Sequence, residues 1–270
     1  TGEDVVGETS DGSDLVRIIT KDSLTANDGT IQADLPVAKD KTTQNCNVMA
    51  YLKSHGYPLA FERRHDETSF IARKCKMFPV EFVARRRPYG SYLKRNPGAT
   101  SSDIFDPPIV EMFHKHTIVM PCLTHKNQHA INPETRLMPE DQAREYFMVD
   151  GEWTHEVYTD PYIDLQMSGW ELYPPKQPRH DMQPLMTIRN EIRGEILDMI
   201  LRGLPACFER IEEAWKKFDV NLIDLKVEWG KVKGKFGDEY VIADVIDNDN
   251  WRIWPNGDPK QQLDKQSFRD

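Results

Sequence analysis

The segment 221–229 constrains the fold most, because apolar and polar residues alternate through it. Side chains point to opposite faces of a strand in turn, so a period of two predicts a β-strand. A second run, 239–246, is predicted to be its partner strand, and the linker between the two runs is polar and contains glycine. Together they predict an antiparallel β-hairpin.

Charged residues occupy one face of the first strand and interrupt the second. Asp224, Lys226 and Glu228 share a face, and Asp244 is the only charge in the run VIADVI. An isolated carboxylate is costly to bury unless it is paired or bound to a metal. In a paired hairpin Glu228 and Asp244 face one cleft, and two carboxylates with nucleotide phosphates are a usual way to hold Mg²⁺. The alternative is the solvated face of an ordinary amphipathic strand.

A second candidate site lies in a basic segment, 85–95, which holds five basic residues around Gly90 and Ser91. Arginine pairs bidentately with carboxylate or phosphate, and a serine beside a glycine N–H completes an anion cradle. Tyr89, Gly90 and Ser91 favour a turn, which suits a pocket. The alternative is an exposed basic run or a localisation-like patch.

The first third of the chain reads as a small, mostly antiparallel β lobe with one helix. The helix is expected over 42–55, ending before Gly56, and 21–40 is expected to be loop. Strands are expected over 14–20, 58–63, 68–74 and 79–85.

The later part of the chain is less regular. Residues 97–110 are rich in turn formers, and 116–185 sustain no period, as in a functional lid or an insertion. Apolar residues then recur at helical spacing from 187 to Gly203, and a second helix is expected after Pro205.

Composition excludes some classes of function. The net charge of −9 argues against a general nucleic-acid binder. No apolar run approaches the roughly 20 residues of a membrane helix, and no signal peptide opens the chain at Thr1. The four cysteines form no C-x-x-C and are expected to be reduced thiols of a cytosolic protein.

Histidine and cysteine gather in one part of the sequence. A zinc site there is conceivable, but the C-x-x-H lacks a second matching pair, so ordinary surface and packing roles are favoured. The residues concerned are His114, His116, Cys122, His125 and His129.

Four separated motifs, in order, resemble one enzyme family. ADVIDNDNWRIWPNGDPKQQLDKQSFRD (243–270) is similar to the closing signature of SAICAR synthetases, or phosphoribosylaminoimidazole-succinocarboxamide synthases, of the animal type. IDLKVEWG (223–230) resembles the family's D-x-K-x-E-[FW]-G strand. VEFVARRRPYGSYLKRNPG (80–98) resembles its arginine–glycine–serine segment. KDSLTANDG (21–29) resembles the family's early K-D-x-x-T-A stretch, and a further segment, DETSFIARKCKMFPVE (66–81), also aligns.

The resemblance implies an α+β, two-lobe fold related to ATP-grasp enzymes. An antiparallel β lobe, residues 1–82, would bind nucleotide, and a larger α/β lobe, 83–270, would hold substrate and metal, with ATP in the cleft. An insertion is expected at about 116–159.

The implied activity is an ATP-dependent, carbon–nitrogen ligation in de novo purine biosynthesis. L-Aspartate would be joined through an acyl phosphate to CAIR, a carboxylated aminoimidazole ribonucleotide. The implied ligands are ATP, Mg²⁺ and these two substrates, with no nucleic acid and no membrane. A cytoplasmic enzyme is expected, and a homo-oligomer is compatible with it.

The resemblance also carries roles onto matching residues. Lys226, Glu228 and Asp244 would be catalytic, and the last two would hold Mg²⁺. Residues facing ATP would be Met77, Glu81 and Lys115. Residues facing the substrates would be Arg85, Gly90, Ser91, Asp160, Arg252, Lys265 and Arg269.

Two departures from the family pattern leave alternatives open. The family opens with a G-K-x-K hairpin, but no lysine precedes Lys21 here. The family's short K-x-D-x-x-x-D-P run is also broken, because a long segment separates Lys115 from Asp160–Pro161. There are two rival hypotheses. The chain is a divergent member that activates another carboxylate or nucleotide, or it is an inactive scaffold.

Overall fold

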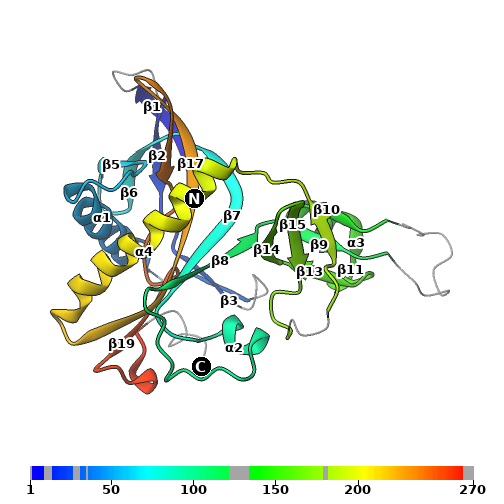
Figure 1. Ribbon diagram of the computed structural model, residues 1–270. Coiled ribbons are helices and arrows are strands. Elements are labelled where there is room, and N and C mark those ends of the chain that lie inside the picture. Colours follow the sequence, from blue (N-terminus) through cyan, green and yellow to red (C-terminus); the bar gives the residue numbers. More distant parts are fainter. Residues whose placement is uncertain are drawn as a thin grey trace.

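One large antiparallel sheet organises the protein (Figure 1). The computed structural model describes residues 2–8, 14–26, 31–34, 36–121, 134–178 and 182–263. The eight strands of this sheet are β16 (Met186–Ile188), β15 (Gly169–Tyr173), β14 (Tyr162–Gln166), β8 (Ile109–His114), β7 (Lys76–Arg85), β17 (Val220–Gly234), β18 (Gly237–Ile242) and β19 (Trp251–Pro255). β17 is central, because β7 pairs along one side while β18 and β19 share the other.

The N-terminal part forms a separate four-stranded sheet with a covering helix. Its strand order is β1 (Gly2–Glu8), β2 (Asp14–Ile19), β6 (Ser69–Arg73) and β5 (Phe61–Arg64), and α1 (Ala38–Ser54) packs on β5 and β6. The strands predicted in this region are confirmed, and the helix ends as predicted before Gly56, whose φ is 81°.

The loop predicted over 21–40 is wrong. A hairpin of β3 (Ser23–Ala26) and β4 (Ile31–Asp34) occupies much of it, and α1 begins already at Ala38. The Ala38 N–H donates to the Asp22 carboxylate over 2.8 Å, which satisfies one of the free N–H groups at the helix start. This acceptor lies 16 residues earlier, so local sequence did not reveal it.

Residues 116–185 are also more regular than expected. A three-stranded sheet places β9 (Thr117–Val119) between β10 (Arg136–Met138) and β13 (Val157–Thr159), beside α3 (Glu140–Phe147) and the short pair β11 (Met148–Val149) and β12 (Glu152–Trp153). These strands are too short to show a period in sequence. The chain then returns to the large sheet, where β14 pairs with β8.

A single long helix, α4 (Gly194–Lys216), replaces the two helices predicted around Pro205. The remaining elements are α2 (Ser91–Arg95) and a 3₁₀ turn, Pro259–Gln261. A proline inside a helix costs about 3 kcal/mol because it removes one hydrogen bond and crowds the preceding turn. The buried face of α4 runs without interruption past this position and offsets that cost; its buried residues include Leu197, Ile200, Leu204, Cys207, Phe208 and Ile211.

We expect Pro205→Ala to raise the melting temperature by a few degrees. The alanine N–H restores the missing backbone hydrogen bond and stabilises the helix. The unfolded chain gains conformational entropy when proline is lost, and this offsets about 1 kcal/mol of that stabilisation. Differential scanning calorimetry of both proteins measures the shift. An unchanged or lower melting temperature would mean that α4 is bent around the proline in a way that alanine cannot relax.

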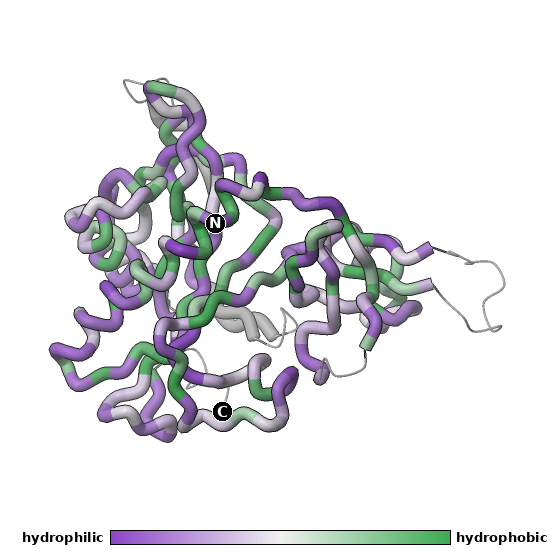
Figure 2. The backbone as a smooth tube through the Cα atoms, in the orientation of Figure 1, coloured by the Kyte–Doolittle hydropathy of each residue, from purple (hydrophilic) through white to green (hydrophobic). Residues whose placement is uncertain are grey.

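The core lies where α4 and the N-terminal helix meet the large sheet. Figure 2 shows hydrophobic stretches along the central strands and hydrophilic stretches on the outer loops. β17 is buried on both faces along most of its length. Cys46, Cys75 and Cys207 are free thiols, as expected. None of the described helices is long and apolar enough to cross a membrane.

Candidate active site

Three acids and two lysines meet beside β17, where β7, β8 and the loop after β18 converge. Lys226 Nζ lies 2.9 Å from Glu81 Oε1, and Lys115 Nζ lies 2.6 Å from Glu228 Oε2. Asp244 is close enough to interact electrostatically with Lys226, Lys115 and Glu81. We call these five residues the acid–lysine cluster. The structure therefore brings together five residues that sequence comparison had assigned to catalysis and to ATP.

Burial makes this cluster electrostatically demanding. Glu228 is only 6% exposed, and burial, followed by repulsion from Asp244, raises the pKa of its carboxyl. Burial likewise raises the pKa of Asp244, although Lys226 opposes this. Burial alone would lower the pKa of Lys226, but Glu81 and Asp244 outweigh it and raise that pKa. Two adjacent acids that resist ionisation favour an added cation between them.

The donor chemistry of this acidic pair suits Mg²⁺. Magnesium takes hard oxygen ligands, usually one or two carboxylates together with phosphate and water. Among the described residues no three His, Cys, Asp or Glu side chains converge as a complete metal site. Glu228 and Asp244 therefore fit a magnesium ion that takes its other ligands from phosphate and water.

Helix α1 holds the loop that carries Asp244. The Asn45 Oδ1 accepts the Ile246 N–H over 2.8 Å, and Gln44 Oε1 accepts the Asn248 N–H over 2.7 Å. Gln44 Nε2 also donates to Asn248 Oδ1 over 3.0 Å. These bonds join residues more than 200 positions apart, so the N-terminal helix fixes the backbone around the acid.

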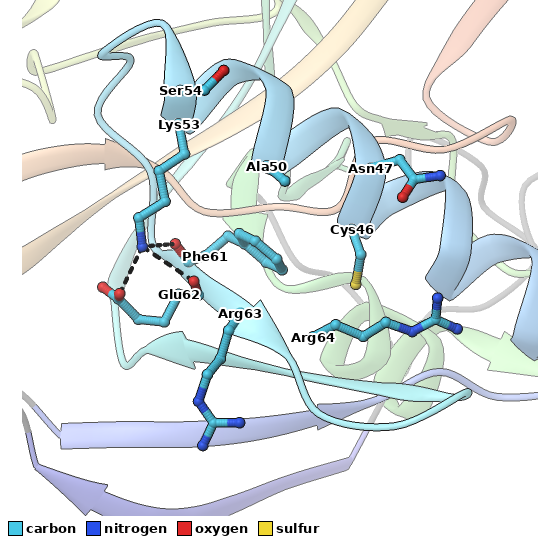
Figure 3. Close-up of a pocket in the computed structure, with 9 residues that line it drawn as sticks. All are labelled: Cys46, Asn47, Ala50, Lys53, Ser54, Phe61, Glu62, Arg63 and Arg64. Atoms are coloured by element: carbon cyan, nitrogen blue, oxygen red, sulfur yellow. Dashed lines mark hydrogen bonds and ion pairs between the residues drawn. The ribbon is translucent and has the colours of Figure 1, made fainter.

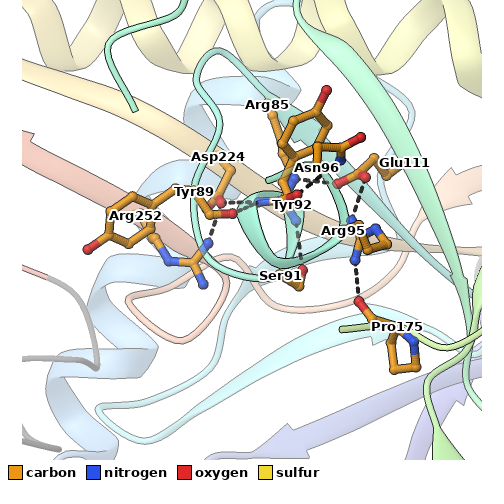
Figure 4. A network of polar contacts seen from close by, with 10 residues as sticks. All are labelled: Arg85, Tyr89, Ser91, Tyr92, Arg95, Asn96, Glu111, Pro175, Asp224 and Arg252. Carbon is orange, nitrogen blue, oxygen red and sulfur yellow. Dashed lines mark hydrogen bonds and ion pairs between the residues drawn. The ribbon is translucent and has the colours of Figure 1, made fainter. Parts of the chain in front are cut away.

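A second group, the arginine cluster, surrounds the start of β17 (Figure 4). It comprises Arg85, Arg95, Glu111, Asp224 and Arg252. Arg85 lies 2.5 Å from both Glu111 and Asp224, and Asp224 also pairs with Arg252. Arg95 lies 2.5 Å from the other oxygen of Glu111. Arg252 is the most exposed guanidinium of the cluster, with 32% of its side chain accessible.

Gly90 and Ser91 lie beside this cluster, and their substrate-binding role stays a prediction. Gly90 has a φ of 57°, and a Cβ there would lie 2.9 Å from Arg252 Nη2, so backbone strain and contact both favour glycine. Ser91 Oγ accepts from Arg85 Nη2 over 3.4 Å, at the long end of hydrogen bonding.

The solvated-strand alternative is wrong. Asp224 is 4% exposed and, like Glu228, is buried. Both β17 faces are covered, so a polar face here cannot be explained by contact with water. The basic segment is not an exposed run either, because Arg85 and Arg95 are buried and paired.

The other predicted site residues lie elsewhere or outside the described chain. Met77 is half-exposed on β7, opposite Gly230. Asp160 lies between β13 and β14 with a φ of 51°. Lys265 and Arg269 fall outside the described residues.

Sequence reasoning missed Glu111 as a member of the site, and it placed Arg95 only within the basic segment 85–95. Glu111 stands alone among apolar residues in the strand IVEMFH, the same signal that singled out Asp244. This isolated charge could have identified Glu111 from the sequence, although no family motif accompanied it. Arg95 gave no such signal, since it ends a run of basic residues.

The zinc hypothesis finds no support in the described residues. His114 is fully buried; its Nε2 lies 3.0 Å from Glu191, and its Nδ1 accepts the His116 N–H over 3.1 Å. Both ring nitrogens are therefore engaged in packing roles, as the favoured alternative expected. Cys122, His125 and His129 lie outside the described residues.

The His114–Glu191 contact predicts a pH-dependent contribution to stability. The His114 hydrogen bond, against a smaller opposing effect of burial, lowers the pKa of Glu191. A carboxyl with a lowered folded pKa adds stability above its unfolded pKa of about 4, and loses it as pH falls through the folded value. Glu191→Gln should thus lower the melting temperature at pH 7, and the difference should shrink below about pH 4.

Melting curves between pH 3 and 8 test this, with the exposed Glu145→Gln as the control. A melting-temperature difference that is independent of pH would contradict the assignment.

A hollow lined by residues of α1 and β5 lies elsewhere in the protein (Figure 3). Lys53, which lines it, is already bound to the Phe61 and Glu62 carbonyls and to the Glu62 carboxylate, 2.7 Å away. The hollow contains none of the residues of the two clusters. It is therefore separate from the candidate active site.

Comparison with known sequences points to one family. The sequence model of SAICAR synthetase matches residues 7–144 and 182–270. The chain is 34% identical over 268 residues to the multifunctional protein ADE2 of Gallus gallus, covering 98% of this chain and 50% of that protein. It is 33% identical over 260 residues to the phosphoribosylaminoimidazole-succinocarboxamide synthase of Chloroflexus aggregans, covering 95% and 78%. The chain spans half the length of the animal relatives it matches.

Solved structures share the fold. The SAICAR synthetase of Pyrococcus horikoshii OT3 superposes with a TM-score of 0.62 at 21% identity, covering 99% of this chain and 89% of that one. A SAICAR synthetase in complex with ADP gives 0.62 at 22% identity, with coverages of 99% and 87%. The predicted fold is thus confirmed as a SAICAR synthetase fold of helices and antiparallel sheets.

Proposed function

The chain belongs to the SAICAR synthetase family, and we propose that it joins L-aspartate to CAIR at the expense of ATP, forming SAICAR for purine biosynthesis. One observation carries the proposal. Asp224, Lys226 and Glu228 alternate along β17 in unbroken register with β7. They therefore share one face, about 7 Å apart per step. The arginine cluster and the acid–lysine cluster are neighbours on one strand.

This adjacency suits a reaction between an anionic substrate and ATP. The CAIR carboxylate attacks the γ-phosphorus, ADP leaves, and an acyl phosphate forms. The aspartate amine then attacks the acyl carbon, phosphate leaves, and the amine loses a proton to give the amide. The reaction needs positioning and charge neutralisation rather than an enzyme nucleophile.

The chain's own residues supply both requirements. Lys226 and Lys115 offset the charge of the transferring phosphoryl group. Arg252, Ser91 and Arg85 hold the ribonucleotide, with Arg252 the most accessible of the three arginines. Mg²⁺, when bound by Glu228 and Asp244, would add positive charge against the ATP phosphates.

We further propose the two-lobe arrangement related to ATP-grasp enzymes. Residues 1–82 would form the nucleotide-binding lobe and 83–270 the substrate lobe, with an insertion at about 116–159. β7 runs from Lys76 to Arg85 and connects them. ATP would lie in the cleft against Met77, Glu81 and Lys115, while Asp160, Lys265 and Arg269 would face substrate.

The rival hypotheses explain less. An inactive scaffold gains nothing from this acidic pair. Burying charge costs stability, and an inactive protein has no activity that would favour keeping the pair. A divergent activity would rest on the absence of lysine before Lys21 and on residues 145–181, which the family's sequence model does not match. Neither feature indicates a particular substrate other than CAIR.

Turnover of the purified chain with ATP, Mg²⁺, L-aspartate and CAIR tests the proposal. We expect ADP and SAICAR in equal amounts, and neither when CAIR is omitted. ATP binding without SAICAR formation would reject the proposed substrate. Product formation with another carboxylate but not with CAIR would favour the divergent hypothesis.

A further inference from the structure

Glu111 occupies the centre of the arginine cluster. Its Oε2 lies 2.5 Å from Arg85 Nε, and its Oε1 lies 2.5 Å from Arg95 Nη2. It projects from β8, opposite Val83 of β7, and its side chain is 6% exposed. One buried carboxylate therefore fixes two guanidiniums that come from different elements (Figure 4).

Arg85 is held on every side by protein groups. Besides Glu111, its guanidinium donates to Asp224, to the Tyr89 carbonyl over 3.4 Å and to Ser91. A guanidinium has five N–H donors in a rigid plane, so contacts on both edges fix its orientation. Glu111 holds the Nε edge, and its loss would leave Arg85 free to rotate away from Ser91.

Stability alone does not account for this arrangement. Buried ion pairs are often no more stable than apolar side chains of similar volume. Three guanidiniums and two carboxylates also leave the arginine cluster with one net positive charge. A group of arginines with a net positive charge suits an anionic ligand such as a phosphate or a carboxylate.

Arg95 connects this cluster to the β14–β15 segment. Its guanidinium lies 4.9 Å from the ring centres of both Phe113 and Tyr162, and donates to the Pro175 carbonyl. Tyr162 and Pro175 belong to residues 145–181, which the family's sequence model does not match. The same carboxylate thus connects a segment that the family's sequence model does not match to the candidate substrate site.

We propose that Glu111 is a positioning residue for the anionic substrate. It sets Arg85, and with it Ser91 and Asp224, in the orientation that receives the ribonucleotide, and it couples the β14–β15 segment to that site through Arg95. This inference rests on the proposed function, because its first test measures the binding of CAIR, the proposed substrate.

Glu111→Gln tests the proposal with little change of volume. The amide loses the charge and one of the two acceptors. We expect the KM for CAIR to rise about 10- to 100-fold while the KM for ATP stays within about twofold, since a charged hydrogen bond is lost at one site only.

The matched control is Glu212→Gln. Glu212 is similarly buried, 7% exposed, and accepts two hydrogen bonds from Arg86, but Arg86 lies outside the arginine cluster. We expect a comparable loss of thermal stability with both KM values unchanged. If Glu111→Gln and Glu212→Gln behave alike, or if Glu111→Gln raises both KM values equally, Glu111 is only structural and the proposal is wrong.

A second readout separates this inference from the proposed function. The Arg85 Nε–H resonance, assigned by its loss in Arg85→Lys, should exchange slowly in the wild type and rapidly in Glu111→Gln. A wild-type protein that makes no SAICAR would reject the proposed function, and this resonance would then decide the positioning role. Slow exchange retained in Glu111→Gln would overturn it.

Discussion

Glu228→Gln and Asp244→Asn should each lower kcat by about a thousandfold or more. Each substitution removes one of the two carboxylates that fit Mg²⁺ and leaves Lys226 and Lys115 without their full counter-charge. The loss should appear in kcat at saturating ATP and CAIR, because in the proposed reaction the acidic pair acts on the phosphoryl group during its transfer.

The same variants should be at least as thermally stable as the wild type without divalent cations. Burial raises the pKa of both acids, so each one destabilises the other when ionised. Asp238→Asn, on the exposed end of β18, is the control and should change neither property. A kcat within about tenfold of the wild-type value would contradict a catalytic role of the acidic pair.

Asp224→Asn should destabilise the protein by about 3–5 kcal/mol, lowering the melting temperature by about 10 °C. Asp224 pairs with Arg85 and Arg252 through the same oxygen, and both Asp224 and Arg85 are buried. Removing its charge leaves a buried guanidinium with one carboxylate fewer. CAIR binding should weaken in parallel, because Arg252 loses its anchor.

Calorimetry and CAIR titration measure both effects, with Glu209→Gln as the control. Glu209 pairs with Arg86 at a half-exposed position, so its loss should cost about 1 kcal/mol or less. A melting temperature of Asp224→Asn within about 2 °C of the wild type would show that solvent or rearrangement compensates the arginines.

The sequence predicted the centre of the molecule better than its periphery. β17 carries an alternation that continues over many residues, and Asp244 stands out as a charge among apolar neighbours, so both were accessible. The residue roles came from resemblance to the family rather than from spacing. They stay predictions, and the geometry adds that seven of these residues gather in two neighbouring clusters beside β17, with Gly90 and Ser91 next to them.

What sequence could not supply was mostly long-range. The start of α1 depends on Asp22, and the small sheet pairs Val119 with Val157, far along the chain. Pro205 gave a misleading local signal, because packing of a continuous apolar face outweighs it. The contacts of Glu111 depend on the fold, because β8 places its carboxylate between two arginines from other elements.

Transfer of isotope from CAIR tests the central claim most directly. CAIR labelled with ¹⁸O in its carboxylate would be incubated with the protein, ATP, Mg²⁺ and L-aspartate, and the phosphate released would be analysed by mass spectrometry. We predict one ¹⁸O in each phosphate, because the carboxylate oxygen that attacks ATP leaves with the phosphoryl group. SAICAR formed with unlabelled phosphate would contradict activation of the CAIR carboxylate, and the absence of SAICAR would contradict the assigned reaction itself.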